Sequence, residues 1–213
     1  MAPRFDRVRD QVRRIDRGLC ADRASQLVEF AVALPLLVVF VVGIFDFSGA
    51  FTLKQKLTIG ARDAARAAAA EPVNDLCASC GVPVSVNDAF WTIDNSLKAN
   101  QINDCGITNS PSSSAAPTWT YSAAAGAGGC VNIGIPPLTI TINRGYYFPA
   151  VGAQPANVGC VSQSAAGQTA VIATCISIQY AYQWRFGRAA SLFGPTPLLP
   201  STITAVGVAM NEN

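Results

Sequence analysis

The chain lacks histidine entirely and has few charged residues. Asp, Glu, Lys and Arg make up 13% of its 213 residues, well below the roughly 25% that is usual for soluble domains. Without histidine, the commonest general base and the commonest metal ligand are missing. No phosphate-binding loop of the Gly-x-x-x-x-Gly-Lys type occurs, and Gly126-Ala-Gly-Gly129 follows no expected strand. We therefore expect no catalytic residue, no cofactor and no metal, and hence no enzyme.

The chain also lacks a strongly basic surface, because its formal net charge is only +2. Nucleic acid is therefore not an expected partner. The charge is uneven, since residues 1–24 carry seven arginines against four aspartates. This basic leader precedes a long apolar run, and the positive-inside rule then predicts that the leader stays in the cytoplasm.

An uncharged run of 16 apolar or small residues extends from Phe30 to Phe45. Extended to Leu27 and Phe51, the segment is long enough as a helix to cross the roughly 30 Å hydrocarbon core of a bilayer. Glu29 and Asp46 then fall near the two interfaces, where isolated carboxylates usually have a function. A cleaved secretory signal peptide ending at Ser48-Gly49-Ala50 is the alternative. It is less favoured because the helical pattern continues past residue 50.

Apolar or small residues recur at helical spacing beyond the membrane segment. They form one stripe: Leu53, Leu57, Ala61, Ala64 and Ala68. Pro72 is a natural stop, so the pattern predicts a single helix from about Ser25 to Ala70. A second amphipathic helix is expected from Ser85, as its cap, to Ile102.

Strand signals dominate the last third of the chain. Alternation predicts strands at 138–142, ended by Asn143-Arg-Gly145, at 170–186 and at 202–210. In the second of these, one face should form the core: Ile172, Thr174, Ile176, Ile178, Tyr180, Tyr182, Trp184 and Phe186. Trp119-Thr-Tyr121 reads as a short strand or as an exposed aromatic contact. The prediction is an α+β fold, with an antiparallel sheet of three or four strands packed on the earlier helix.

Six of the seven cysteines follow the apolar run, and Cys20 precedes it. An even number on the exported side predicts disulfides formed in an oxidising compartment. The candidates are Cys77, Cys80, Cys105, Cys130, Cys160 and Cys175, and their 15 possible pairings stay open. A structural disulfide is favoured over redox catalysis for the Cys77-x-x-Cys80 motif, since no helix begins there. Zinc bound by Cys77, Cys80, Cys105 and Cys130 is a third reading.

One segment of the chain resembles the start of the TadE-like proteins. It runs from Ser25-Gln-Leu-Val-Glu-Phe-Ala-Val-Ala-Leu-Pro-Leu-Leu-Val-Val-Phe40 through Gly43-Ile-Phe-Asp46 to Ala61-Arg-Asp-Ala-Ala-Arg66. These are pseudopilins of the tight-adherence, Flp-type branch of type IV pili. Residues 23–71 carry the specific resemblance, and residues 170–210 carry a weaker one. The resemblance implies a pilin-like protein with a basic leader (1–24), a transmembrane and extended helix (25–71) and an exported, disulfide-stabilised α+β domain (72–213).

The resemblance also implies processing by a prepilin peptidase between Ala24 and Ser25, where the family usually has glycine before the cut. Glu29 would become the fifth residue of the mature chain and, with Phe30, would serve assembly. Its expected partner is the freed α-amine of a neighbouring subunit; a carboxylate that merely reaches the interface is the alternative.

The implied partners are membrane lipid, other pilin or pseudopilin subunits, the peptidase and the inner-membrane platform of the pilus. The implied location is the bacterial inner membrane, in a single pass with a cytoplasmic N-terminus and a periplasmic or extracellular domain, or within a pilus. A different function also stays open, that of a membrane-tethered binding or adhesion module. The cysteine-stabilised middle and Trp119-Thr-Tyr121 would then form its ligand site.

Overall fold

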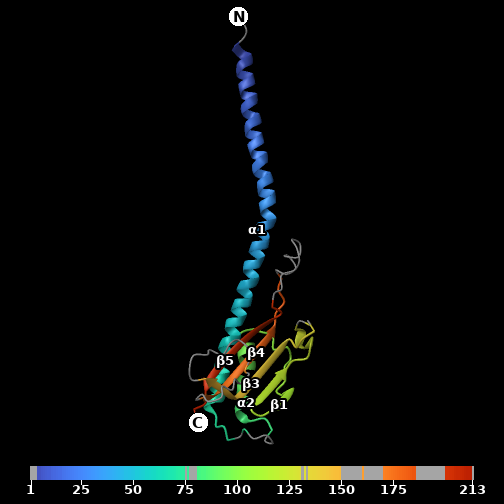
Figure 1. Cartoon of the computed structure of the whole chain (residues 1–213). Helices are drawn as coiled ribbons and strands as arrows, with labels where there is room; N and C mark the ends of the chain where they lie inside the picture. The colour runs from blue at the N-terminus through green and yellow to red at the C-terminus, as the bar shows by residue number, and fades with distance from the viewer. Residues whose placement is uncertain are drawn as a thin grey trace. The chain divides into compact units, whose positions relative to one another are not determined.

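In the part of the chain that the structure describes, the secondary structure consists of two α-helices, a short 3₁₀ helix and five strands (Figure 1). The computed structural model describes residues 4–74, 76, 81–130, 132, 134–149, 160, 170–185 and 200–212, of which 4–24, 148, 149, 170 and 171 are described as backbone only. In chain order the elements are α1 (Arg4–Ala70), α2 (Val84–Ala99), β1 (Ser113–Ala115), β2 (Thr118–Ser122), η1 (Ala127–Gly129), β3 (Leu138–Pro149), β4 (Ala170–Ala181) and β5 (Thr202–Met210). This is the predicted α+β class.

Helix α1 is longer than predicted. It ends at Ala70, as the sequence pattern indicates, but it begins at Arg4 rather than near Ser25 and it accommodates Pro35. Contacts divide the chain into two units. The first contains α1 as far as Asp46, and the second contains α1 from Phe47 together with α2 and all the described strands.

The strands form one antiparallel sheet in the order β1-β2-β3-β4-β5. It therefore has five strands where three or four were predicted. Strand β3 does not stop at Asn143-Arg-Gly145 but passes through an irregularity there and pairs with β4 as far as Pro149. Strand β4 ends at Ala181, earlier than predicted, and Phe186 lies outside the described residues.

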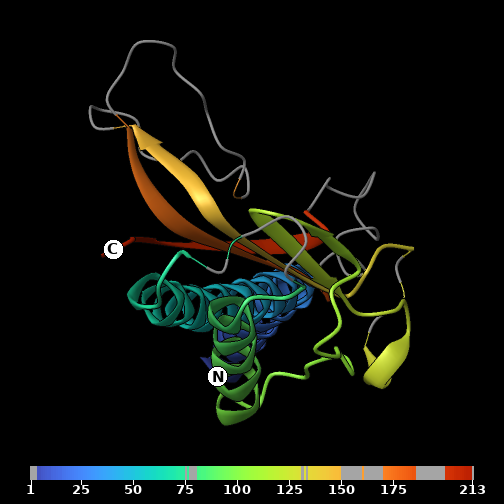
Figure 2. The same ribbon diagram turned by 90° about the horizontal axis from the view of Figure 1, so that it is seen from below.

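The main core lies where α1 and α2 pack against the same side of the sheet, as Figure 2 shows. The predicted stripe on α1 is confirmed, because Leu57, Ala61, Ala64 and Ala68 are all buried and Leu53 is partly buried. Large side chains from α2 and the sheet complete the core: Phe90, Ile93, Leu97, Trp119, Tyr121, Ile140, Ile142, Ile176 and Ile178. Small residues on α1 allow the helix backbone to approach the sheet closely.

The predicted core face of β4 is only partly right. Ile176 and Ile178 are buried in the main core, but Ile172 is 52% exposed. The opposite face is not simply solvated, since Ala173 and Cys175 form a second buried cluster with Tyr146 and Cys160. The disulfide from Cys175 to Cys160 places Cys160 against this face of the strand. Strand periodicity alone does not reveal this contact.

One further local prediction is wrong. Ser85 does not cap α2, because the cap position is Pro83 without a side-chain hydrogen bond and Ser85 is buried inside the helix.

Of the two readings of Trp119-Thr-Tyr121, the short strand is confirmed. Trp119 and Tyr121 lie on β2 with exposed fractions of 1% and 0%. They are core residues, so the alternative of an exposed aromatic contact is wrong.

Disulfides join Cys105 to Cys130 and Cys160 to Cys175, with Cα–Cα distances of 5.3 and 5.4 Å. Cys77 and Cys80 lie outside the described residues. Because Cys105 and Cys130 are bonded to each other, they do not supply thiolates to the four-cysteine zinc set. The first bridge joins the segment just after α2 to the end of η1. The Asn103 amide also donates to the Gly128 carbonyl there, at 2.6 Å.

Replacing Cys105 and Cys130 together with serine is expected to lower the free energy of unfolding by about 3 kcal/mol. The bridge closes a loop with a sequence separation of 25, and losing it restores that loop's freedom to the unfolded chain. Urea unfolding of the purified chain in detergent measures the change. An unchanged midpoint would show that the bridge does not stabilise the domain.

Candidate membrane anchor and assembly helix

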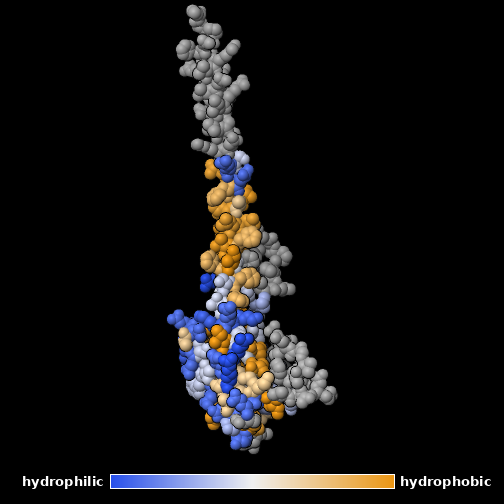
Figure 3. All heavy atoms as spheres, turned by 90° about the vertical axis from the view of Figure 1, so that its left-hand side faces the viewer, coloured by the Kyte–Doolittle hydropathy of each residue, from blue (hydrophilic) through white to orange (hydrophobic). Residues whose placement is uncertain are grey.

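Helix α1 exposes a long apolar surface before it enters the folded domain. Figure 3 shows hydrophobic residues gathered along this part of the helix. The exposed large residues from Leu27 to Phe45 are Leu27, Val28, Phe30, Val32, Leu34, Leu36, Leu37, Val38, Phe40, Val41, Ile44 and Phe45. Among the described residues, the helical stretch Ser25–Ala70 is long enough and apolar enough to cross a membrane. Such an extended apolar surface marks a contact with lipid or protein.

Glu29 is exposed at the start of this surface, one helical turn after Ser25. The Ser25 hydroxyl donates to Oε1 of Glu29 at 3.5 Å, and Phe30 beside it is 62% exposed. The bond between Ala24 and Ser25 lies inside α1. If the chain were cut there, the new α-amine would lie one turn from the Glu29 carboxylate.

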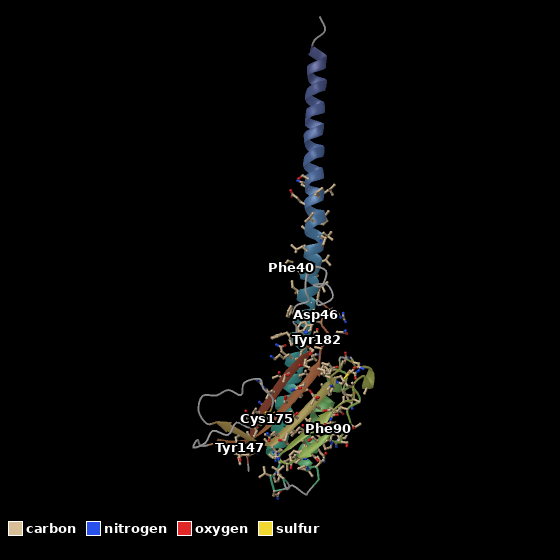
Figure 4. The ribbon with its side chains drawn as sticks, turned by 45° about the vertical axis from the view of Figure 1, so that its right-hand side comes forward. Phe40, Asp46, Phe90, Tyr147, Cys175 and Tyr182 are labelled. Atoms are coloured by element: carbon tan, nitrogen blue, oxygen red, sulfur yellow. A yellow bond between two sulfur atoms is a disulfide. The ribbon has the colours of Figure 1, made fainter. Side chains whose placement is uncertain are left out.

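Asp46, the acid predicted at the membrane exit, is buried. Its side chain has a relative exposure of 6%, and Gly43 and Ala50, on the same helix face, are also buried. Figure 4 labels Asp46 where the apolar part of α1 ends. The two acids that flank the apolar run therefore differ in exposure: Glu29 is exposed, whereas Asp46 is buried.

The C-terminal end of α1 is capped by a buried arginine from the sheet. Arg144, on β3, is 0% exposed. Its guanidinium donates to the backbone carbonyls of Ala68, Glu71 and Pro72, the last two at 2.9 and 3.2 Å. The final carbonyls of a helix have no partner within the helix and carry partial negative charge, so a cation is favourable there.

The last residues of the chain complete this cap. The Arg144 guanidinium also donates to the Thr174 hydroxyl at 3.0 Å, and that hydroxyl donates to Asn211 at 2.6 Å. The Asn211 amide donates back to the Arg144 carbonyl at 3.2 Å. The sequence reading missed this network because it placed Arg144 in a strand-ending turn, and no local pattern connects these three residues.

Strand β5 touches the α1 backbone directly at Gly207. A Cβ at this position would lie 2.4 Å from the carbonyl carbon and oxygen of Ala61 and 2.5 Å from the amide nitrogen of Arg62. A Cβ essentially never comes this close to a non-bonded atom, so only glycine fits here without a backbone shift. The candidate membrane helix is therefore also a tightly packed core helix of the domain.

Tyr121 is the titratable group most affected by the core. Its ring packs on Phe90 with centroids 4.7 Å apart, and its hydroxyl has no hydrogen-bond partner among the described residues. Burial raises the pKa of Tyr121 to about 12. Burial also raises the pKa of Tyr146 and Tyr180, the latter with a smaller contribution from Asp104.

We expect the stability of the domain to fall as the pH rises from about 10 towards 12. The folded chain keeps the Tyr121 proton to a higher pH than the unfolded chain. Its contribution is therefore complete below pH 10 and is lost as the pH rises through the folded pKa. Tyr121→Phe should weaken this alkaline decline and leave stability at neutral pH unchanged or raised by about 1 kcal/mol. Urea unfolding of both chains at several pH values is the measurement, and identical pH profiles would contradict the assignment.

These features define an α+β protein with a candidate membrane helix, and the same helix supplies part of the domain core. The model of the TadE-like protein family matches residues 24–66, which confirms the resemblance of this segment to that family. The matched residues include Glu29, the exposed apolar surface and the buried positions Ala61 and Ala64. No curated protein and no solved structure matches the chain.

Proposed function

We propose that the protein is a non-enzymatic structural or assembly component, a pseudopilin or minor pilin, of a Tad/Flp-type pilus or a related secretion apparatus. Its contribution would be to surface attachment. The match of the TadE-like model to residues 24–66 carries this proposal. The exposed apolar half of α1 supports it, because a subunit of such an apparatus has to reside in a membrane and pack against other helices.

In this role α1 crosses the inner membrane once, with the arginine-rich leader in the cytoplasm and the sheet domain in the periplasm or beyond. The disulfides among the described residues agree with an oxidising location for the domain. A prepilin peptidase would remove the leader between Ala24 and Ser25. The mature subunit would then meet the inner-membrane platform and other pilin subunits through α1.

Glu29→Ala is expected to leave membrane insertion intact and to abolish assembly. A carboxylate in the apolar boundary that pairs with a neighbouring subunit's α-amine contributes about 3 kcal/mol when its removal leaves the amine unpaired. Incorporation into sheared fibres or platform complexes should therefore fall by about a hundredfold. Asp63→Ala is the matched control, because Asp63 is an exposed acid on the same helix whose ion pair with Arg66 is long, at 3.8 Å.

Both variants should remain in the membrane fraction after extraction with alkaline carbonate, and only Glu29→Ala should be missing from the assembled fraction. Assembly of Glu29→Ala at the wild-type level would remove the role assigned to this residue. The same loss in Asp63→Ala would show that any acid on α1 matters.

The alternative function, a tethered binding module, loses the aromatic part of its expected ligand site in the structure. It relied on Trp119 and Tyr121 as contact residues, and both are buried in the core. No other observation favours that function over an assembly role.

A further inference from the structure

Three aromatic side chains meet where α1 leaves its apolar run. The ring of Trp184, just after β4, lies 5.1 Å from that of Phe47 and 4.9 Å from that of Tyr182, measured between centroids. The Tyr182 hydroxyl is close to the α1 backbone, since a Cβ on Gly49 would be 3.3 Å from it. Figure 4 labels Tyr182. The helix and the end of β4 thus build one aromatic cluster.

This cluster is held in place but is not sealed in the core. The Trp184 indole donates to the Pro200 carbonyl at 2.6 Å, and the Tyr182 amide donates to the Ser201 carbonyl at 2.9 Å. Tyr182 and Trp184 are half-buried, whereas Phe47 is 52% exposed. Phe51, one turn further along α1 on the same face, is 63% exposed. The half-buried rings of Tyr182 and Trp184 have an apolar body and a polar tip, so they suit the boundary between water and hydrocarbon.

The position of the cluster along α1 matches the far side of a bilayer. Phe47 follows Glu29 by eighteen residues, which is about 27 Å of helix, close to the roughly 30 Å thickness of the hydrocarbon core. With Glu29 at one interface, residues 47–51 fall at the other. Lys54, which is exposed, follows Phe47 by seven residues, or about 10 Å of helix. A base this close to the cluster favours contact with anionic headgroups.

We propose that Phe47, Phe51, Tyr182 and Trp184 form an interfacial anchor that holds the base of the domain in the headgroup layer of an anionic bilayer. This inference rests on the membrane insertion contained in the proposed function and adds a second contact with lipid, made by the sheet domain itself. Trp and Tyr are enriched at this depth in membrane proteins because their amphipathic rings suit the headgroup level, and Phe47 and Phe51 add exposed apolar surface beside them. The anchor fixes how far the domain stands from the membrane before any assembly.

The test uses the full chain in vesicles of phosphatidylethanolamine and phosphatidylglycerol that contain nitroxide-labelled lipid. Tryptophan fluorescence is recorded with the nitroxide near the headgroup and, separately, near the chain end. Wild type should be quenched more strongly by the shallow label. Trp184→Phe should lose most of this quenching, whereas Trp91→Phe should keep it. Trp91 is the matched control because it is 49% exposed on α2.

Flotation of the vesicles with bound protein measures insertion separately, and thermal unfolding shows whether each variant is folded. Equal quenching of wild type and folded, inserted Trp184→Phe would overturn the anchor and leave membrane insertion standing. Failure of the wild-type chain to float would overturn insertion and the anchor together. If Trp184→Phe fails to fold, Trp184→Tyr keeps an interfacial aromatic ring and should lose the same tryptophan quenching.

Discussion

Replacing Arg144 with methionine is expected to lower the free energy of unfolding by about 4 kcal/mol. The substitution leaves the carbonyls of Ala68, Glu71 and Pro72 and the Thr174 hydroxyl without the donor that they share. Each buried acceptor left unsatisfied costs about 1–3 kcal/mol. Methionine fills a similar volume, so the loss reports the missing hydrogen bonds and charge rather than a cavity.

Arg66→Met is the control for this change. Arg66 lies on the same helix, but its side chain is 77% exposed and its ion pair with Asp63 is long, so its removal should cost less than about 0.5 kcal/mol. Urea unfolding of both variants in detergent gives the two values. Equal effects of the two substitutions would mean that Arg144 does not hold the end of α1.

Gly207→Ala should destabilise the domain by about 3 kcal/mol, because the new methyl group meets the α1 backbone at 2.4 Å. A backbone obstacle cannot rotate away, so either the strand or the helix has to shift. Gly49→Ala is a matched control, since its Cβ would meet only the Tyr182 hydroxyl, at 3.3 Å. That change should stay within about 1 kcal/mol, because alanine favours the helix.

Thermal unfolding of the two glycine variants separates them. Only Gly207→Ala should have a clearly lower melting temperature than wild type. Similar melting temperatures for Gly207→Ala and wild type would show that β5 does not pack on α1 as closely as described.

The features that the sequence predicts correctly are those whose residues repeat at a regular spacing along the chain. The stripe at Leu57, Ala61 and Ala64 repeats at helical spacing, and the strand from Thr202 to Met210 alternates. The end of α1 at Ala70 and both bounds of β5 were therefore predicted correctly. Each pattern records which side of an element is buried. That information lies within a few neighbouring residues and needs no knowledge of the rest of the fold.

The missed features depend on residues far apart in the chain. Arg144 contacts Ala68 across a separation of 76 residues, and the need for glycine at position 207 arises from Ala61. A lone arginine in a turn and a lone glycine in a strand have many possible causes. Trp119 and Tyr121 were ambiguous for the same reason, since only the strands and helix around β2 decide that they are buried.

These contacts give α1 two functions in one element. Between Leu27 and Phe45 it presents apolar side chains outward, and its C-terminal part is fixed to the sheet by Gly207 and Arg144. Ala50 and Leu57 already belong to the domain core. A cut after Ala50, as in a secretory signal peptide, would therefore sever a helix that is continuous with the core.

The mass of the mature chain extracted from membranes is the most direct test of these two functions of α1. We expect a chain that retains the apolar helix and begins at Ser25, after removal of residues 1–24 by a prepilin peptidase. A chain that begins at or after Phe51 would contradict it, because the anchor, Glu29 and the aromatic contact at Phe47 would all be absent from the mature protein.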